Sequence, residues 1–584
     1  MKSSDYIINF FVDRGVGTIF GYIGGMITHL VDSADKNPNV RFVQTYHEQS
    51  AAMAAEGYAI ESGKLGVAMS TSGPGATNMI TGIADAYFDS IPVVYITGQV
   101  NSYEYKYDKP IRQQGFQETD IVAMVRPITK YAVLVDHIDD LRYELEKAVY
   151  IANSGRKGPV VIDLPMNIQR QEIDPETMRS FEAPFHDTTF QFDIRETEES
   201  LCKAERPMLL LGGGCQHPIV MAELDKFIQT TQIPVVTSLM GRGVIDETYP
   251  HYVGMVGSYG NRCANMAIAN VDVLLVLGSR LDTRQTGTMI DSFLPNAKII
   301  HVDIDNNELE CHRINRQIKI HAEVFDFLQV LNKSNIQTGD FISWKEYLKY
   351  LKINYNQDKE IERFVENKMP YHCMNYINRM MKEGDIVTTD VGQNQMWAAQ
   401  TIQLKKGQKY LTSGGLAPMG YAMPSAIGCA FANPSKTVYS ITGDGGFHMA
   451  IQSLPLMSQY GLNIKLCVLN NGALGMITQF QHLYFDNRLA GTVPAGGYMA
   501  PNIKVLAEAY GMKYFLVDKN NINNEELYSQ IESTQTCLIE MKMEGLTTVC
   551  PKLEYNKPIS MPIPLLDEDE YKRAMDIKIC FGLS

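Results

Sequence analysis

Short apolar runs alternate with longer segments of helical spacing along most of the chain. In the first 167 residues, five apolar runs predict strands: GTIFGY, VRFVQTY, GVAMST, IPVVYIT and GPVVIDLP. The next part contains PMLLLGGG, VDVLLVLGSRLDTRQTG and KIIHVDID, and the last contains GDIVTTDVGQ, TVYSI and IKLCVL. Strands that alternate with helices indicate parallel sheets covered by helices on both faces. We therefore expect an α/β protein made of three doubly wound parallel-sheet domains.

The chain of 584 residues is long enough for three or four domain-sized units. We expect an N-terminal domain over 1–167, a central domain over 190–335, a C-terminal domain over 360–550 and a tail over 551–584. A charged, proline-containing segment predicts a linker at 168–190. The first and last domains share a layout of strand-edge turns followed by Ala/Gly-rich helices, which suggests a distant duplication. The tail carries no motif, and we interpret its acidic patch LLDEDEYKR as solvated cover.

The most informative stretch runs from Gly443 to Asn471. TVYSI leads into Gly443-Asp444-Gly445, and IKLCVL ends at Asn470-Asn471, with a helix-like segment between them. Two parallel strands that end side by side would place Asp444 and Asn471 at the sheet edge where α/β proteins bind ligands. Carboxylate and amide oxygens suit Mg²⁺, and the glycines let backbone N–H groups approach a diphosphate. Each turn alone is common, but the two together favour a magnesium-diphosphate site.

Other motifs are weaker when taken singly. Glu48 ends a strand and begins an Ala-rich helix, where an acidic residue is favoured by the helix dipole alone. The turn Ser72-Gly73-Pro74-Gly75 is a generic anion-friendly turn. In the central part, a triple glycine follows one strand and charged residues follow two others. This pattern indicates a nucleotide or dinucleotide binder, with a structural spacer domain as the alternative.

Charge and cysteine usage narrow the class of protein. The net charge of −14 and the pI of about 5.4 argue against nucleic acid or an anionic membrane as partner. Ten cysteines without a CxxC pair indicate reduced thiols and a cytoplasmic location. The first residues, MKSSDYIINFFVDRG, predict an amphipathic helix rather than a signal peptide. No run approaches the ~18 apolar residues of a membrane span.

Taken in order, the motifs resemble those of a known family. HEQ with AEGYA, TSGPGATN, FQE, DLP, GSRLDTR, DVGQNQMWAAQ, TSGGLAPMG and GDG…NN succeed one another over nearly the whole chain. The chain resembles the thiamine-diphosphate-dependent acetolactate synthase (acetohydroxyacid synthase) large catalytic subunits. The resemblance implies a pyrimidine-binding domain, a central nucleotide-binding-like domain and a diphosphate-binding domain. It also implies a 2-oxo acid substrate and a homodimer or homotetramer whose sites are shared between chains.

The resemblance assigns roles to particular residues in the thiamine diphosphate site. Asp444 and Asn471 would hold Mg²⁺ together with a backbone carbonyl near Ala473. Contacts to the cofactor would come from Gln393, Ala417, Met419, Gly443, Gly445 and Gly446. Met419 would lie beneath the bent cofactor, and the carbonyl near Ala417 would accept from its 4′-amino group. Glu48, from the other chain, would be the catalytic carboxylate on N1′ of the pyrimidine ring.

The same resemblance implies FAD in the central domain and a substrate pocket beside the thiamine. The implied FAD residues are Arg156, Gly212, Gly213, Met255, Arg280, Asp282, Arg284 and Asp303. In this family the flavin has no net redox task, so a flavoprotein would still be a carboligase. The implied substrate residues are Gly24, Gly25, Phe116, Gln117, Met476 and Phe480.

Three features depart from the family pattern. Phe480 stands where the family has Trp, Met166 follows DLP where acetolactate synthases have Lys, and the loop NSYEYKYDKPIRQQG before FQE is expanded. These features are more typical of relatives that transfer an acetyl unit to a keto-sugar nucleotide in surface-polysaccharide synthesis. Neutral drift is the alternative, because an apolar wall is kept and loops vary freely.

We therefore expect a carboligase that decarboxylates pyruvate and transfers the two-carbon unit to a second carbonyl. The favoured product is 2-acetolactate, as in branched-chain amino acid biosynthesis. The alternatives are acetyl transfer to a keto-sugar nucleotide, a simple 2-oxo-acid decarboxylase, and a non-enzymatic protein that has kept the fold.

Overall fold

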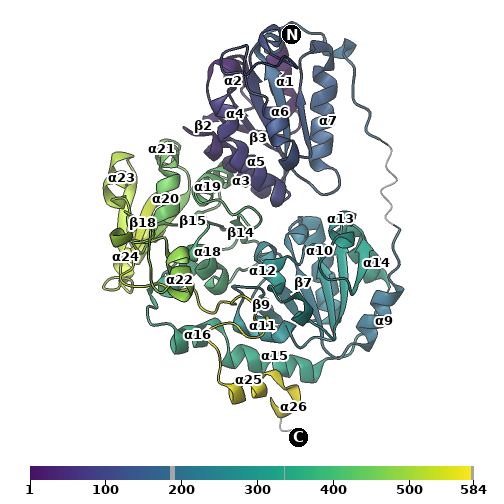
Figure 1. Cartoon of the computed structure of the whole chain (residues 1–584), viewed down its shortest axis with the longest axis vertical. Helices are drawn as coiled ribbons and strands as arrows, with labels where there is room; N and C mark the ends of the chain where they lie inside the picture. Colours follow the sequence, from purple (N-terminus) through teal and green to yellow (C-terminus); the bar gives the residue numbers. More distant parts are fainter. Residues whose placement is uncertain (185–190, 335, 581–584) are drawn as a thin grey trace.

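Three six-stranded parallel sheets, each in its own domain, make up the computed structural model (Figure 1). The structure describes residues 1–184, 191–334 and 336–580. The end of the expected linker (185–190), the last position of the expected central domain (335) and the end of the expected tail (581–584) lie outside the described residues. The expectation of a three-domain α/β protein is confirmed.

The N-terminal sheet has the order β2-β1-β3-β4-β6-β5. Its strands are β1 (Thr18–Tyr22), β2 (Arg41–Gln44), β3 (Gly66–Ser70), β4 (Val93–Gln99), β5 (Tyr131–Leu134) and β6 (Val160–Pro165). The helices are α1 (Ser3–Val12), α2 (Thr28–Lys36), α3 (Glu48–Ser62), α4 (Pro74–Asn78), α5 (Ile80–Phe88), α6 (Ile121–Val125), α7 (Leu141–Asn153) and α8 (Met166–Gln169). The edge strand β5 was not among the expected strands, although Tyr131–Leu134 is a short apolar run; its four residues are all half-buried.

The C-terminal sheet has the order β14-β13-β15-β16-β18-β17. Its strands are β13 (Ile386–Thr389), β14 (Lys409–Thr412), β15 (Val438–Gly443), β16 (Ile464–Asn470), β17 (Lys513–Val517) and β18 (Cys537–Lys542). The helices are α17 (Met369–Met380), α18 (Gln393–Thr401), α19 (Ala422–Ala432), α20 (Asp444–Met449), α21 (Leu454–Gln459), α22 (Gly475–Tyr484), α23 (Ile503–Ala509) and α24 (Glu525–Ser533). Counted along the chain, this strand order is the same as in the N-terminal sheet, which supports the suggested duplication.

The central sheet has a different order, β12-β11-β10-β7-β8-β9. Its strands are β7 (Pro207–Leu211), β8 (Val235–Thr237), β9 (Tyr252–Met255), β10 (Val273–Leu277), β11 (Lys298–Asp303) and β12 (Gln317–His321). The helices are α9 (Arg195–Lys203), α10 (Pro218–Thr231), α11 (Arg262–Ile268), α12 (Thr283–Thr286), α13 (Asn306–Glu310) and α14 (Val324–Lys333). Read from β9, the order is that of the dinucleotide-binding fold, with its switch point between β7 and β10.

Two helices of small residues join the N-terminal and C-terminal domains, where α3 crosses α19 (Figure 1). A Cβ atom at Gly57 would lie 2.1 Å from the carbonyl oxygen of Ser425, and one at Gly428 would lie 1.9 Å from that of Ala54. The two backbones therefore approach as closely as glycine allows. The Ala-rich helix that begins at Glu48 therefore packs closely against a helix of the same chain.

The remaining helices lie beneath the central domain. They are α15 (Ile342–Asn354) and α16 (Gln357–Phe364), and, from the tail, α25 (Glu568–Met575) and α26 (Ile577–Cys580). Figure 1 shows the tail returning from the C-terminal domain to this layer. None of the helices in the described part of the chain combines the length and apolar character needed to cross a bilayer.

Candidate active site

Asp444 and Asn471 follow neighbouring strands of the C-terminal sheet. β15 and β16 are parallel, with Gly443 opposite Leu469, so both residues stand at the carboxyl edge of the sheet. Asp444 is 1% exposed, and its carboxylate accepts a 2.9 Å hydrogen bond from the Tyr498 hydroxyl. Burial raises the pKa of Asp444 to about 6, although the hydrogen bond from Tyr498 opposes the shift. No Lys or Arg among the described residues forms an ion pair with this carboxylate.

The amide of Asn471 is oriented by a small network. Its Nδ2 donates to Thr547 Oγ1 at 2.8 Å and to Gln393 Oε1 at 3.4 Å. Gln393 Nε2 in turn donates to the Thr547 carbonyl at 2.9 Å and to Gln479 Oε1 at 3.1 Å. Because these contacts occupy the amide N–H groups, the Asn471 Oδ1 atom, which accepts from the Ala473 amide, is the one available to a cation.

This donor set fits a hard divalent cation that keeps phosphate oxygens among its ligands. Within the described ranges, no group of three or more His, Cys, Asp or Glu side chains could hold a metal. A cation here would therefore need mixed oxygen ligands: the buried Asp444 carboxylate, the Asn471 amide oxygen, a backbone carbonyl and the ligand's own oxygens.

The glycines of the GDGG turn make room for their neighbours. A Cβ atom at Gly445 would lie 2.6 Å from Leu474 Cδ2 and 3.1 Å from Met419 Cε. One at Gly446 would lie 2.8 Å from the carboxyl carbon of Asp390. Met419, from a different loop, is thus brought directly to the turn that follows β15. At Gly443 a Cβ atom would lie 3.3 Å from Asn394 Oδ1.

The loop that carries Ala417 and Met419 is fixed at both ends. Ala417 has a positive φ of 62°, and its amide donates to Ser413 Oγ at 2.9 Å. At the other end, the Gly420 amide donates to Asp390 Oδ1 at 2.8 Å. Asp390 is fully buried, and burial raises its pKa to about 6 against the opposing effect of these hydrogen bonds. Asp390 begins the quoted motif DVGQNQMWAAQ, but it was not assigned to the site from the sequence.

Glu48 lies in the N-terminal domain at the first turn of α3 and is 7% exposed. Asn78 Nδ2 donates to Glu48 Oε2 at 3.0 Å. A Cβ atom at Gly75 would lie 3.1 Å from Glu48 Oε1. The HEQ and TSGPGATN motifs, each weak alone, therefore form one site. Asn78 was not singled out from the sequence, although it ends the quoted motif.

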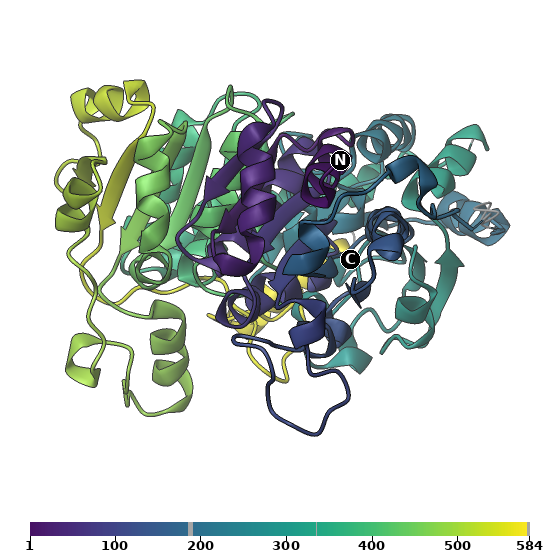
Figure 2. The same ribbon diagram turned by 90° about the horizontal axis from the view of Figure 1, so that it is seen from above.

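The expected substrate residues of this domain surround the same turn. A Cβ atom at Gly24 would lie 2.5 Å from Thr71 Cβ, whereas one at Gly25 would meet open space. Gln117, with a positive φ of 63°, packs its backbone on Gly73. The neighbouring Phe116 is 80% exposed. Figure 2 shows the expanded loop before it standing out from the body of the protein.

The expanded loop is organised by one carboxylate. Glu118 accepts hydrogen bonds from the backbone amides of Lys106, Gln114 and Gly115 at 2.7 to 3.0 Å. Desolvation alone would raise the pKa of Glu118, but these three donors outweigh it and lower the pKa. The loop is therefore closed on itself rather than extended.

Two half-sites result. Among the described residues, no hydrogen bond links Glu48 with Asp444, Asn471 or Met419. One half carries the carboxylate, and the other carries the candidate cation and diphosphate ligands. The hydrogen bonds that orient the side chains of each half come from residues of that same half.

The expected FAD residues lie around the switch point of the central sheet and its junction with the other domains. A Cβ atom at Gly212 would lie 2.1 Å from the Gly278 carbonyl, so this glycine is required by the packing of two strand-end turns. Arg280 Nη2 lies 3.5 Å from Asp282 Oδ2. Arg156 forms ion pairs with Glu308 at 2.7 Å and Asp305 at 3.3 Å.

The other expected FAD residues are more dispersed. Gly213 packs near Met240, and Met255 is buried at the end of β9 within a core cluster of the C-terminal domain. Asp303 is buried, and desolvation raises its pKa. Arg284 is exposed, and its carbonyl accepts a hydrogen bond from the Ser258 amide at 2.6 Å.

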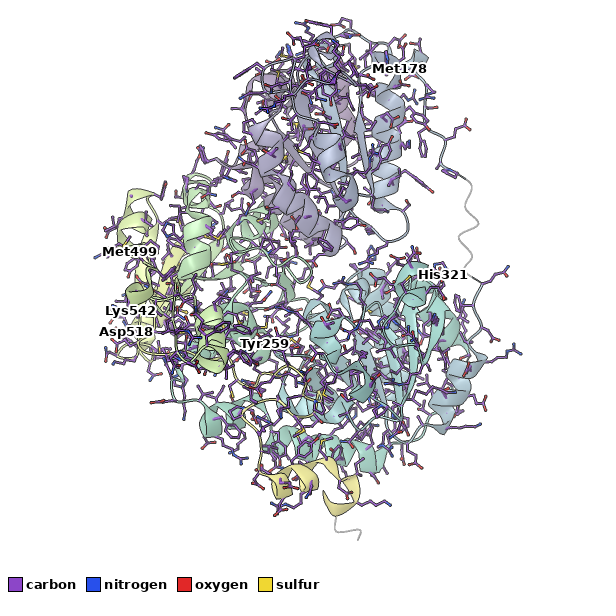
Figure 3. The ribbon with its side chains drawn as sticks, in the orientation of Figure 1. Met178, Tyr259, His321, Met499, Asp518 and Lys542 are labelled. Carbon is purple, nitrogen blue, oxygen red and sulfur yellow. The ribbon has the colours of Figure 1, made fainter. Side chains whose placement is uncertain are left out.

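The expected acceptor residues lie on α22. Met476 Sδ is 3.4 Å from the hydroxyl of Tyr259, which lies where the central and C-terminal domains meet (Figure 3). Phe480, one turn further, packs against Tyr484 with ring centroids 4.8 Å apart. The tail also reaches this helix, since Lys552 Nζ lies 5.8 Å from the Phe480 ring centroid. The first residues of the tail, in which no motif was recognised, therefore contact α22.

Comparison with known proteins places the chain in a family. Three family models match: the N-terminal TPP binding domain of thiamine pyrophosphate enzymes at residues 1–124, their central domain at 194–331 and their C-terminal TPP binding domain at 390–541. These matches fall on the three sheets in the expected order.

Similar proteins cover nearly the whole chain. The acetolactate synthase isozyme 2 large subunit of Escherichia coli is 35% identical over 94% of this chain and 97% of its own length. A probable acetolactate synthase large subunit of Methanocaldococcus jannaschii is 38% identical over 93% and 92%. The acetolactate synthase large subunit of Lactococcus lactis is 34% identical over 94% of each chain. The chain belongs to the thiamine pyrophosphate enzymes, in the group of the acetolactate synthase large subunits.

Proposed function

We propose that the protein is a thiamine-diphosphate- and Mg²⁺-dependent carboligase that decarboxylates pyruvate and joins the two-carbon unit to a second carbonyl, most favourably a second pyruvate, to give 2-acetolactate and CO₂. The observation that carries the proposal is the pairing of a buried Asp444 with an oriented Asn471 at one sheet edge, with Glu48 buried at the head of α3.

The bound thiamine diphosphate would supply the carbon nucleophile and the electron sink for loss of CO₂. The chain supplies position and proton control. Asp444, Asn471 and the carbonyl of Ala473 would hold Mg²⁺ against the diphosphate. Met419, fixed beside Gly445, would support the middle of the cofactor. Glu48 would share a proton with N1′ of the pyrimidine ring, steadied by Asn78.

Product identification tests this function. Purified protein with thiamine diphosphate, Mg²⁺ and pyruvate should form acetolactate, and removal of the cation with a chelator should abolish the reaction reversibly. Acetaldehyde as the main product would favour a simple decarboxylase. Carbon–carbon bond formation only when a keto-sugar nucleotide is added would favour the alternative acceptor suggested by Phe480, Met166 and the loop before Phe116.

The proposal also includes FAD as a cofactor bound by the central domain. It is supported by the dinucleotide-binding strand order and by the position of Gly212, Arg280 and Asp303 at the carboxyl ends of β7, β10 and β11. Arg156 already forms ion pairs with Asp305 and Glu308, so it is less available to bind FAD than Gly212, Arg280 and Asp303 are. A yellow protein with a flavin spectrum would support the proposal, and a colourless active enzyme would remove it.

We also infer a homodimer as the smallest active unit. The inference is supported by the separation of the two half-sites and by the exposed apolar side chains of Tyr22, Ile23 and Tyr46 beside the Glu48 half. The described cysteines are all free thiols, which favours a reducing compartment such as the cytoplasm.

A further inference from the structure

Lys552 occupies an unusual position at the beginning of the tail. The residue is only 8% exposed, and its ammonium lies over two aromatic rings of α22, 5.8 Å from the centroid of Phe480 and 5.9 Å from that of Tyr484. No hydrogen bond or ion pair of this ammonium to another described residue is present. Burial lowers the pKa of Lys552, and the charge of the Glu554 carboxylate, which is not in contact with the ammonium, opposes this shift.

The Lys552 ammonium lacks hydrogen-bond acceptors for its N–H groups among the described residues. It has three N–H donors, and rings at nearly 6 Å lie at the outer limit of a cation–π contact. Burying a charge without an anionic partner is unfavourable, so such a residue is expected to gain a partner from a ligand. The alternative is that the aliphatic stem simply covers the aromatic rings.

The backbone holds Lys552 firmly in place. Its amide donates to the Ile563 carbonyl at 3.0 Å, and its carbonyl accepts from the Ile563 amide at 2.7 Å. On one side, the Pro551 carbonyl accepts from Gln400 Nε2 at 2.9 Å, and on the other, the Leu553 amide donates to the Ser258 carbonyl at 2.7 Å. The side chain is therefore presented by a segment clamped between two domains.

The same segment is connected to the candidate cation site. Gln479, which precedes Phe480, exchanges two hydrogen bonds with the backbone of Val549, at 2.9 and 3.1 Å. Gln479 also accepts from Gln393, the residue that orients Asn471. One continuous set of contacts thus runs from the proposed Mg²⁺ ligand to the wall that carries Phe480 and Lys552.

We propose that Lys552 determines acceptor specificity by binding an anionic group, carboxylate or phosphate, of the second carbonyl substrate as it lies against Phe480 and Tyr484. This inference rests on the proposed carboligase function. It assigns a positioning role: Lys552 would orient the acceptor carbonyl without exchanging a proton.

Matched acceptors test the proposal in the cofactor-loaded enzyme with pyruvate as donor. 2-Oxobutyrate and propanal differ by the carboxylate, and dihydroxyacetone phosphate and dihydroxyacetone differ by the phosphate. In the Lys552→Met variant, the product ratio of charged to neutral acceptor should fall roughly tenfold or more for the pair that the site serves. The Lys552→Arg variant, which keeps the positive charge, should keep most of the ratio.

Three outcomes would overturn the proposal: an unchanged ratio in Lys552→Met, an equal fall for charged and neutral acceptors, or an equal loss in Lys552→Arg and Lys552→Met. The last two would indicate that the stem only packs on the rings. The thermal midpoint of each variant is measured alongside to show that it is folded.

A binding measurement keeps the two proposals apart. 2-Hydroxybutyrate carries the carboxylate but has no carbonyl, so it binds without reacting. Its Kd, measured by calorimetry, should rise roughly tenfold in Lys552→Met. If the unaltered protein forms no carbon–carbon bond from pyruvate, the proposed function is wrong. If the Kd is the same in the unaltered protein and in Lys552→Met, only the proposed role of Lys552 is wrong.

Discussion

The Glu48 carboxylate receives one side-chain hydrogen bond, from Asn78, and is otherwise enclosed by the turn at Gly75. In the proposed mechanism, Glu48 would contribute to catalysis through the proton at N1′ rather than through cofactor affinity. We expect Glu48→Gln to lower kcat by about 10²- to 10⁴-fold while the Kd for thiamine diphosphate stays nearly constant. Steady-state rates and a calorimetric titration check this, and a fully active Glu48→Gln enzyme would refute the mechanism.

Three carboxylates at the junction of the N-terminal and C-terminal domains affect how stability depends on pH. Glu56 and Asp85 are fully buried and Asp89 is half-buried beside them, and no Lys or Arg forms an ion pair with them among the described residues. Desolvation raises the pKa of all three, to about 8 for Asp85 and about 6 for Asp89. Asp89 also accepts from the amides of Gly414 and Gly415, at 2.9 and 2.8 Å.

Because these pKa values are higher in the folded state, the folded protein binds more protons than the unfolded chain between about pH 4 and 8. Stability should therefore be greatest at the acidic end of this window and fall as the pH rises through it. Thermal midpoints measured across the window test the slope. Glu56→Gln should flatten it, whereas Glu526→Gln, at an exposed position, should leave it as it is; a midpoint that rises with pH would contradict the argument.

Single residues also mark the limit of prediction from the sequence. Asp444, Asn471 and Glu48 follow apolar strands and sit in recognisable motifs, so their positions could be predicted. Asp390, Asn78 and Lys552 could not, because their roles arise from contacts between segments far apart in the chain: Asp390 with the amide of Gly420, and Lys552 with the ring of Phe480.

At the scale of elements, the long buried strands β4 and β10 were predicted, whereas three edge strands and the short buried strands β8 and β9 were not. β10 and β4 are buried at every position and read as continuous apolar runs. β12 and β17 mix buried and exposed positions, which weakens their strand patterns, and β5 is a run of only four apolar residues with no buried position. All three of these strands lie at sheet edges.

The contact between α3 and α19 gives a test at this scale. The Gly428→Ala methyl group would lie 1.9 Å from the Ala54 carbonyl oxygen, so one helix must move. We expect a loss of about 1–3 kcal/mol in the free energy of unfolding. Gly17→Ala is the matched control, because its new Cβ would lie at 3.7 Å from the Tyr58 hydroxyl, an ordinary contact. Equal unfolding curves for the two variants would show that the helices are not closely packed.

At the scale of the whole molecule, the N-terminal and C-terminal sheets share one strand order and meet through α3 and α19. This relation could be suspected from the sequence but not established, because the two domains share a layout and no visible residue repeat. In contrast, the dinucleotide-binding order of the central sheet was indicated by its glycine turn and by the charged residues after its strands.

The proposed sharing of sites between chains can be tested with two inactive variants. Glu48→Gln damages one half-site and Asp444→Asn the other, so each homodimer should be inactive. Co-expressed with different affinity tags, they would form hybrid dimers in which one of the two sites combines the undamaged halves. Random pairing makes half of the dimers hybrids, so the mixture should regain about a quarter of the unaltered activity, and the purified hybrid about half. If both half-sites of one chain worked together, every site in the hybrid would carry one damaged half and no activity would return. Recovery of activity in the doubly tagged fraction would therefore place the reacting centre between Glu48 of one chain and the Asp444–Asn471 edge of another.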